Sequence, residues 1–384
     1  MEISKVKEIS NSLGYTPQKI EVLSQEASDR QYCRLILNTH DYKEFTENWY
    51  KYEYNSKLRN RTWPGSNDPC SVIFCFLDPK VGSNKRFVEL SNLAHQQQPE
   101  NFRDWHYPHS IDGLIPKVYA FEDKIGVTIQ EDFYESFLEK FPDGFEHVGM
   151  DSFPTCEFPF DALVTFVGLD FPDLKYLSNE DLEAQMKRFE DYFLSDLLEI
   201  NLANFGSQKE NLQNLIEETI QNLSLQPWVN CHQDFEVRNL MYRPDDLGKV
   251  GIIDFQDTCK GPVGIDLAGI YIDHYNFNLT FDILKCFDDY SEINRTLDHW
   301  DFAGIKDHKT IYEYAIWGGI QRNLRILGTL SNLYRQNGRT FRLPDLPLIL
   351  NNLIVIIPDN HQELKDFLRI EVFNLLNKKL EAIL

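Results

Sequence analysis

Alternating apolar and polar residues in the first third of the chain predict a β-rich region. Residues 20–37 alternate around a polar turn at Ser28-Asp29, and residues 71–79 form a mostly apolar run typical of a buried strand. Residues 117–121 and 125–129 flank a polar turn and predict a hairpin. Two short helices are also expected in this region, over residues 3–14 and 87–94.

In the rest of the chain, apolar residues recur three and four positions apart, and this spacing predicts helices. The expected helices cover residues 182–202, 212–223 and 310–334, with a last amphipathic helix over residues 364–376. Asn337-Gly338 is expected to end the longest helix, because glycine favours the left-handed conformation of helix C-termini. Residues 38–70 are predicted to be an insertion between strands, and residues 142–160, rich in Pro, Gly, Asp and Phe, a loop.

The composition suits a packed protein of one large or two modest domains, with 384 residues of which 42% are apolar. Lysine and arginine total 38 against 60 aspartate and glutamate, so the net charge is −22. This charge predicts that neither nucleic acid nor an anionic membrane is a partner. It leaves cationic small molecules open as ligands.

Cysteine usage and the lack of long apolar runs predict a soluble, cytoplasmic protein. The seven cysteines are scattered and form no C-x-x-C pair, which favours reduced thiols. Residues 1–7 lack the apolar core of a signal peptide. The apolar run over residues 353–357 is far shorter than the roughly 20 residues that a membrane span needs.

A motif near the middle of the chain indicates the chemistry. His232, Asp234 and Asn239 follow the pattern H-x-D-x-x-x-x-N, and Asp254 ends the apolar run of residues 250–253. This is the working half of a kinase active site. Asp234 can accept the proton of an attacking hydroxyl, while Asn239 and Asp254 offer the oxygen ligands that Mg²⁺ prefers. The alternative is a chance His-x-Asp pair with a turn-forming aspartate, which the complete pattern makes less favoured.

Three neighbouring motifs resemble the aminoglycoside phosphotransferase and choline kinase superfamily. They are His232-Gln233-Asp234 with Asn239, Ile253-Asp254-Phe255, and Gly261-Pro262 with Asp266-Leu267-Ala268. The resemblance implies an α/β (α+β) protein-kinase-like fold of two lobes. The β-rich small lobe that binds ATP would be residues 1–133, and the mainly helical catalytic and substrate-binding lobe residues 134–384. Asp266 would be structural and would hydrogen-bond the catalytic loop.

Further blocks are similar to the cell-wall amino-sugar anomeric kinases. They are residues 27–35, 238–241, 254–257, 261–262, 317–328 and 343–347. The resemblance implies ATP- and Mg²⁺-dependent phosphorylation of the anomeric hydroxyl of N-acetylmuramate or N-acetylglucosamine, in the recycling of cell-wall sugars. The small-molecule sugar would be the partner of this protein.

The same resemblance assigns roles to individual residues. Asp234 would be the catalytic base, with Asn239 and Asp254 as metal ligands. ATP would meet the turn with Ser28 and Arg30 and the hinge with Glu131 and Phe133, although acidic residues also favour a helix N-terminus. Substrate would meet Arg238, Asp257 and Arg322, and a surface ion pair is the alternative for Arg322.

One expected group is missing from the small lobe. A kinase normally carries a lysine on the third strand that pairs with the α- and β-phosphates. Here the strand ends in Leu77-Asp78-Pro79, and the turn at Ser28-Asp29 lacks the G-x-G-x-x-G glycines. The replacement cation is one of four residues: Arg30, Arg34, Lys80 or Lys85.

Three other functions fit the same core. One is an aminoglycoside kinase with an acidic pocket, and another is a kinase for choline or a lipopolysaccharide sugar. The third is a nucleotide-binding regulatory protein without turnover, which the missing lysine and glycines favour. The complete set of Asp234, Asn239 and Asp254 argues against it.

Overall fold

The computed structural model describes residues 2–23, 29–37, 70–97, 113–140, 157–242, 250–275, 305 and 308–384. The chain divides into two compact units. Unit 1 holds the described residues of Met1–Pro99, Ser110–Tyr134 and Tyr242–Gln256, and unit 2 those of Glu135–Met241 and Asp257–Leu384. Ser28, most of the predicted insertion and most of the predicted loop over 142–160 lie outside the described residues.

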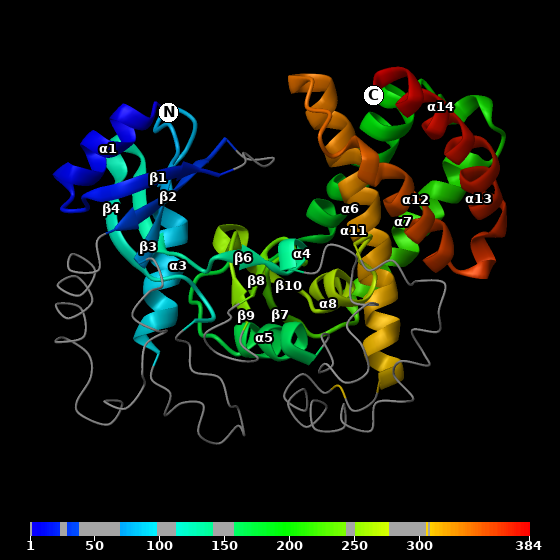
Figure 1. Cartoon of the computed structure of the whole chain (residues 1–384). Coiled ribbons are helices and arrows are strands. Elements are labelled where there is room, and N and C mark those ends of the chain that lie inside the picture. The colour runs from blue at the N-terminus through cyan, green and yellow to red at the C-terminus, as the bar shows by residue number, and fades with distance from the viewer. Residues whose placement is uncertain are drawn as a thin grey trace. The chain divides into compact units, whose positions relative to one another are not determined.

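Unit 1 is built on a five-stranded antiparallel sheet with the order β1-β2-β3-β5-β4 (Figure 1). Its strands are β1 (Pro17–Val22), β2 (Gln31–Leu37), β3 (Cys70–Phe76), β4 (Val118–Glu122) and β5 (Val127–Glu131). The predicted hairpins and buried strand are confirmed. The 3₁₀ turn η2 (Asp123–Ile125) joins β4 to β5 and ends at Gly126, whose φ of +68° suits glycine.

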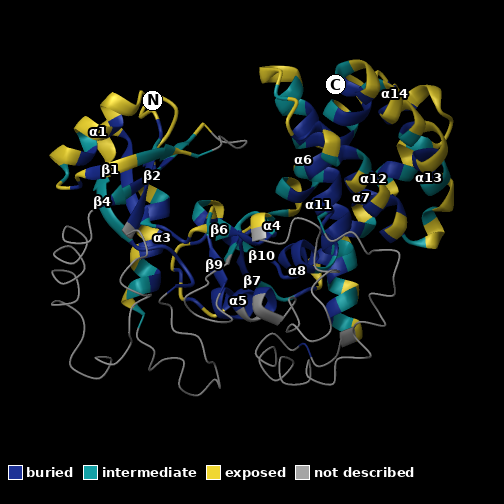
Figure 2. Ribbon diagram, viewed as in Figure 1, coloured by how far each residue is buried: buried dark blue, intermediate teal, exposed yellow. Residues whose placement is uncertain are grey.

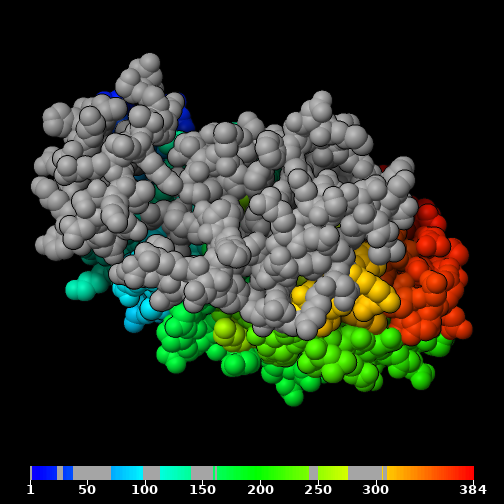
Figure 3. All heavy atoms as spheres, turned by 90° about the horizontal axis from the view of Figure 1, so that it is seen from below, coloured from blue at the N-terminus to red at the C-terminus, as the bar shows by residue number. Residues whose placement is uncertain are grey.

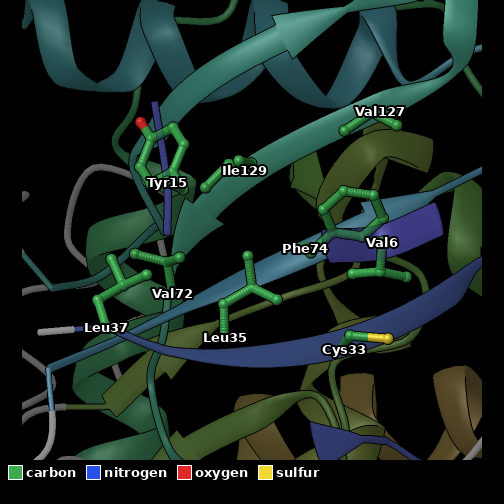
Figure 4. Close-up of a cluster of buried hydrophobic side chains, with 9 residues drawn as sticks. All are labelled: Val6, Tyr15, Cys33, Leu35, Leu37, Val72, Phe74, Val127 and Ile129. Carbon is green, nitrogen blue, oxygen red and sulfur yellow. The ribbon is translucent and has the colours of Figure 1, made fainter. Parts of the chain in front are cut away.

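One face of this sheet carries a hydrophobic core that explains the alternating pattern (Figure 4). Every second residue of β2 and β3 points into it, together with Val6 from helix α1 (Ile3–Ser12). The members are Val6, Tyr15, Cys33, Leu35, Leu37, Val72, Phe74, Val127 and Ile129. The second helix of the unit, α3 (Lys85–Gln96), buries Phe87, whose ring stacks on Phe255 with centroids 4.7 Å apart.

Unit 2 is mainly helical and is organised around α11 (His308–Asn337), much of which is buried (Figure 2). α11 packs against α6, η4, α7, α8 and α12. The helices of this unit are α4 (Phe137–Lys140), α5 (Glu157–Val167), α6 (Asn179–Arg188), π-helix η4 (Phe189–Leu197), α7 (Gln208–Ser224), α8 (Gly264–Tyr271), α11, α12 (Leu346–Ile356), α13 (Gln362–Phe367), π-helix η10 (Leu368–Val372) and α14 (Phe373–Ile383). The last of these lie on the surface of the unit, in red in Figure 3.

The remaining elements are short. Strands β7 (Trp228–Cys231) and β10 (Cys259–Pro262) form an antiparallel pair in unit 2. The other short elements are β6 (Glu135–Ser136), β8 (Leu240–Tyr242), β9 (Val250–Ile252), η5 (Leu202–Asn204), η6 (Phe255–Asp257), η8 (Leu343–Asp345) and η9 (Asp359–His361).

Two glycines let helix α8 approach its neighbours closely. A Cβ at Gly318 of α11 would lie 1.9 Å from the carbonyl oxygen of Gly264. A Cβ at Gly269 would lie 1.7 Å from the carbonyl oxygen of Phe235. Since real Cβ contacts are never this short, α8 reaches both α11 and the segment after Asp234 only because these positions lack a side chain.

The helical predictions hold with three corrections. Residues 157–160 begin helix α5 and are not part of a loop. Residues 346–356 form helix α12, so the apolar run over 353–357 is mostly its buried C-terminal end. Beyond Arg188 the predicted helix over 182–202 widens into π-helix η4 and ends at Leu197. Gly338 ends α11 as expected, with φ of +62° and its N–H donated to the Tyr334 carbonyl at 2.8 Å.

No helix among the described residues is long and apolar enough to cross a membrane.

Candidate active site

The side chain of Asp266 anchors the loop that follows β7 by two hydrogen bonds. Its Oδ2 accepts the backbone N–H of His232 at 2.6 Å, and its Oδ1 accepts that of Gln233 at 2.8 Å. Asp266 lies at the start of α8 and is 1% exposed. Burial raises the pKa of this carboxyl, against the two backbone bonds and the nearby charges, which act to lower it. The predicted structural role of Asp266 is confirmed.

Gln233 brings the loop into an unusual conformation directly before Asp234. Its φ is +71°, a left-handed value that costs a non-glycine residue about 1–2 kcal/mol. The side chain compensates by donating to the Asp257 carbonyl at 2.8 Å and accepting from Gln185 of α6 at 3.3 Å. Strained backbone that the surroundings hold in place is typical of functional sites.

The carboxylate of Asp234 is 44% exposed and faces two arginines of α11. Arg325 Nη2 donates to Oδ1 at 2.7 Å, and Arg322 Nη1 lies 3.5 Å from the same oxygen. Desolvation acts to raise the pKa of Asp234, but the charges of Arg325 and Arg322 outweigh it and lower the pKa. The group is therefore an anion at neutral pH, as an acceptor of a hydroxyl proton must be.

Asn239 is oriented by the same loop. Its Nδ2 donates to the backbone carbonyl of Asp234 at 2.8 Å, and its own N–H donates to the Glu236 carbonyl at 2.8 Å. Because Nδ2 is used in this bond, the side chain directs its other end, the neutral oxygen Oδ1, away from the loop backbone. This is the donor atom that the sequence motif assigns to a metal.

Arg322 occupies a different position from the one expected of a substrate ligand. It is 2% exposed and contacts the buried carboxylates of Glu236 and Asp273, the latter at 3.1 Å. It also donates to the Gln233 carbonyl at 3.1 Å. Its guanidinium is therefore engaged by the protein's own acceptors, and it braces the loop from below.

The other two expected substrate residues lie at the edge of the same cluster. Arg238 pairs with Glu236, and its guanidinium carbon lies 5.8 Å from the centroid of the Tyr275 ring. Burial opposes ionisation of Glu236, but Arg238 and Arg322 hold its pKa well below the usual range. The side chain of Asp257 is exposed.

In unit 1, Asp254 follows β9 in a left-handed conformation with φ of +63°. The stacking of Phe255 on Phe87 anchors the next residue. Gln256 Nε2 donates to Asp254 Oδ1 at 2.8 Å, so the exposed carboxylate still presents Oδ2. This arrangement presents a hard anionic oxygen at the end of a strand, as the sequence predicts.

The hinge residues of unit 1 are fixed by an ion pair. Asp132 accepts Arg34 Nε at 2.6 Å and the hydroxyl of Ser71 at 2.6 Å. Glu131 forms backbone and side-chain bonds with Lys117 at the edge of the sheet. Phe133 is 2% exposed, and its ring fills the space that a side chain at Gly251 would occupy. A nucleotide would therefore meet the backbone of Phe133 and not its ring.

The four candidate cations of unit 1 differ in their surroundings. Arg34 is tied to Asp132, Lys80 is exposed, and Lys85 forms only a surface pair with Glu89. Arg30 is half-buried and donates Nε to Asn84 Oδ1 at 3.1 Å, directly before α3. Its positive charge also acts to lower the pKa of Tyr32 on β2 and of Cys75 on β3, against the desolvation that raises both. Arg30 thus links the residue before β2 to the residue before α3.

Among the described residues, no three His, Cys, Asp or Glu side chains are grouped to hold a metal ion. Mg²⁺ keeps several waters and takes few protein ligands, so its binding does not require such a group. In unit 2, Asn239 Oδ1 is an oxygen donor of the kind that this ion prefers, and in unit 1 so is Asp254 Oδ2.

The sequence did not assign roles to Arg325, Asp273 or Gln185. Arg325 had a detectable signal, since residues three apart on a helix share a face with each other and Arg322 had been assigned to the site. Asp273 and Gln185 had none, because Asp273 reaches Arg322, and Gln185 reaches Gln233, from distant parts of the chain.

Residues 161–291 match the phosphotransferase enzyme family. The match covers the Asp234 loop, Asp254 and Asp266, and it confirms the resemblance seen in the motifs. A solved spectinomycin phosphotransferase, in complex with ADP and spectinomycin, has a similar fold with a TM-score of 0.54 and 13% identity, covering 94% of this chain and 99% of its own. This confirms the predicted fold class.

Two curated relatives share part of the sequence. An N-acetylmuramate/N-acetylglucosamine kinase of Neisseria meningitidis serogroup B is 27% identical over 180 residues, which are 45% of this chain and 50% of the relative. A protein of the same name from Pseudomonas aeruginosa is 25% identical over 191 residues, 49% of this chain and 53% of the relative. The chain thus matches about half the length of these relatives.

Proposed function

We propose that this protein is an ATP-dependent kinase that phosphorylates the anomeric hydroxyl of N-acetylmuramate or N-acetylglucosamine. The observation that carries the proposal is the Asp234 carboxylate, anionic and half-exposed, at the end of a loop braced by Asp266 and two arginines. The names of the two curated relatives support the choice of substrate. In this proposal residues 1–133 form the ATP-binding lobe and residues 134–384 the catalytic lobe.

The residues of the loop account for the chemistry on the acceptor side. Asp234 accepts a hydrogen bond from the sugar hydroxyl and takes its proton as the hydroxyl oxygen bonds the γ-phosphorus of ATP and the bond from that phosphorus to the oxygen of the departing ADP breaks. Because Asp266, Arg322 and Arg325 hold the loop backbone by hydrogen bonds, the hydroxyl oxygen would be directed at one position, and such positioning is the main contribution a protein makes to phosphoryl transfer.

Asn239 and Asp254 would hold Mg²⁺, which when bound neutralises charge on the phosphates. On the nucleotide side, Arg30 would pair with the phosphates, the Ser28 turn would cover them, and the backbone near Glu131 and Phe133 would meet adenine. Arg238 and Asp257, at the rim of the loop, would contact the sugar. The product would be a sugar 1-phosphate.

An aminoglycoside kinase is the second candidate, since the net charge of −22 attracts cations. The names of the two curated relatives favour the amino sugar instead.

A coupled ADP-release assay tests the proposal with the purified full chain. N-acetylmuramate, N-acetylglucosamine, kanamycin and choline are compared at equal concentrations, with ATP and Mg²⁺. The proposal expects turnover with one or both amino sugars and at least about tenfold less with kanamycin or choline. Faster turnover with either cation contradicts it. An Asp234→Asn variant is the control for contaminating kinases, since loss of a general base costs about 10²–10⁴-fold.

A further inference from the structure

The base of the proposed reaction is held by a residue from another part of the chain. Arg325, 91 residues beyond Asp234, donates Nη2 to Asp234 Oδ1 at 2.7 Å and lies with Nη1 3.5 Å from Oδ2. The same Nη2 donates to the Gln233 carbonyl at 2.8 Å. The guanidinium therefore faces both carboxylate oxygens and also the backbone that sets their position.

The contacts of Arg325 differ from those of Arg322, its neighbour on the same face of α11. Arg322 is directed inward, to Glu236 and Asp273, and only one of its nitrogens approaches Asp234. The hydrogen bonds of Arg325 all go to the catalytic loop, and its Nε is buried without a hydrogen-bond partner among the described residues. Arg325 is therefore directed at the catalytic loop, whereas Arg322 is directed mainly at buried carboxylates.

The cation of the loop itself, Arg238, is paired with Glu236. The nearest charged residue, two positions after Asp234, is Glu236, which is buried and paired with Arg238 and Arg322. An aspartate that is 44% exposed would otherwise rotate about its side-chain bonds. A planar guanidinium in two-point contact restricts the plane of a carboxylate, which a point charge does not.

We propose that Arg325 is a positioning residue for phosphoryl transfer: its guanidinium fixes the plane of the Asp234 carboxylate so that one oxygen stays directed at the acceptor hydroxyl. The inference rests on the proposed function, in which Asp234 is the catalytic base. Displacement of a reacting group by about 1 Å can cost about 10²-fold in rate. The contribution of Arg325 is expected in kcat, because the residue acts through Asp234 and does not bind the sugar.

The kinetic test compares Arg325→Met, Arg325→Lys and a control, Arg335→Met, in the full chain. Arg335 lies on the same helix, is 57% exposed and pairs with Asp196 at 3.1 Å. Arg325→Met should lower kcat by about 10²-fold while KM for ATP and for the sugar changes less than about twofold. Arg325→Lys should recover part of the loss, since it restores the charge without the fork, and Arg335→Met should behave as wild type. A tenfold rise of either KM with kcat retained would show that Arg325 binds substrate, and would overturn the proposal.

A double-mutant cycle separates this role from a general effect on folding. In an Asp234→Asn background, Arg325→Met should lower kcat by no more than about threefold further, because the group that it positions is already altered. An equal loss in both backgrounds would contradict a role through Asp234.

A structural readout makes the inference independent of the substrate. Crystal structures of wild type and Arg325→Met, grown in the same conditions, should show the Asp234 carboxylate displaced or disordered only in the variant. An unmoved carboxylate overturns the inference whatever the acceptor. If wild type phosphorylates choline or kanamycin and no amino sugar, the proposed function fails, and the kinetic cycle is measured on that acceptor instead.

Discussion

Asp266 Oδ1 accepts the backbone N–H of Gln233 at 2.8 Å, across 33 residues of sequence. This bond holds the one loop residue that must keep a positive φ for Asp234 to point outward. Since a second bond from Asp266 takes the N–H of His232, a single buried side chain determines the start of the catalytic loop.

Asp266→Ala should therefore act mainly by lowering the free energy of unfolding, and not by a direct effect on metal binding or turnover. Two buried N–H groups would lose their acceptor, at about 1–3 kcal/mol each. Urea unfolding, followed by circular dichroism, measures the loss in the free energy of unfolding. Asp359→Ala, at an exposed position, is the matched control and should change stability by less than about 0.5 kcal/mol. A stable Asp266→Ala protein that has lost only metal binding would mean that the roles of Asp266 and Asp254 are exchanged.

Arg322→Met tests whether this arginine braces the loop or binds substrate. Removal of the guanidinium leaves Asp273 buried without its arginine and Glu236 with Arg238 alone, and breaking a buried ion pair typically costs about 3–5 kcal/mol. Thermal and urea unfolding should both show the loss. A variant as stable as wild type, with a raised KM for N-acetylmuramate but not for N-acetylglucosamine, would instead support contact with the lactyl carboxylate.

Asp254→Asn tests the metal site in unit 1. The variant retains the shape of the side chain and the possibility of a bond with Gln256, but loses the anionic oxygen that Mg²⁺ prefers. The Mg²⁺ concentration for half-maximal turnover should rise at least about tenfold, with unfolding unchanged. Titration of Mg²⁺ at saturating ATP measures this. An unchanged Mg²⁺ dependence would place the carboxylate ligand elsewhere.

Asp345 makes the free energy of unfolding of unit 2 depend on pH. Burial acts to raise its pKa, but the bonds to His274 and Arg342 outweigh this and lower it to about 2. A depressed pKa stabilises the fold above the unfolded value of 3.8, by about 2 kcal/mol, and the gain disappears as pH falls through about 2. Asp345→Asn should thus be less stable than wild type at pH 7, and the difference should shrink below pH 4. Urea unfolding at pH 7, 5 and 3 measures it, and a constant difference would refute the assignment.

The sequence was sufficient for the parts of the fold that depend on local pattern. Strands with alternating residues, such as β2 and β3, and the long helix α11 with its glycine stop were predictable. Helix α5 was missed because the proline, glycine and aspartate of residues 142–160 are typical of loops, whereas proline near a helix start is also tolerated. Helix α12 was missed because a uniformly apolar helix has no periodicity to detect.

The candidate site also has residues that a local sequence pattern identifies and residues that depend on tertiary packing. The spacing of Asp234 and Asn239 is local, so the motif identified them, and the brace role of Asp266 followed from the resemblance. The burial of Arg322 and the position of Arg325 depend on the packing of α11 against the catalytic loop, which α8 and its glycines make possible. A sequence motif carries no information on which side of a helix faces a buried carboxylate and which faces a base.

The most direct test of the proposed function is the position of phosphorylation. The full chain is incubated with ATP, Mg²⁺ and either N-acetylglucosamine or its methyl glycoside, and the products are identified by ³¹P and ¹H nuclear magnetic resonance. The proposal predicts a single sugar 1-phosphate from the free sugar and no phosphorylated product from the methyl glycoside, because its anomeric oxygen has no proton for Asp234 to accept. Phosphate on another hydroxyl of the methyl glycoside would contradict an anomeric kinase.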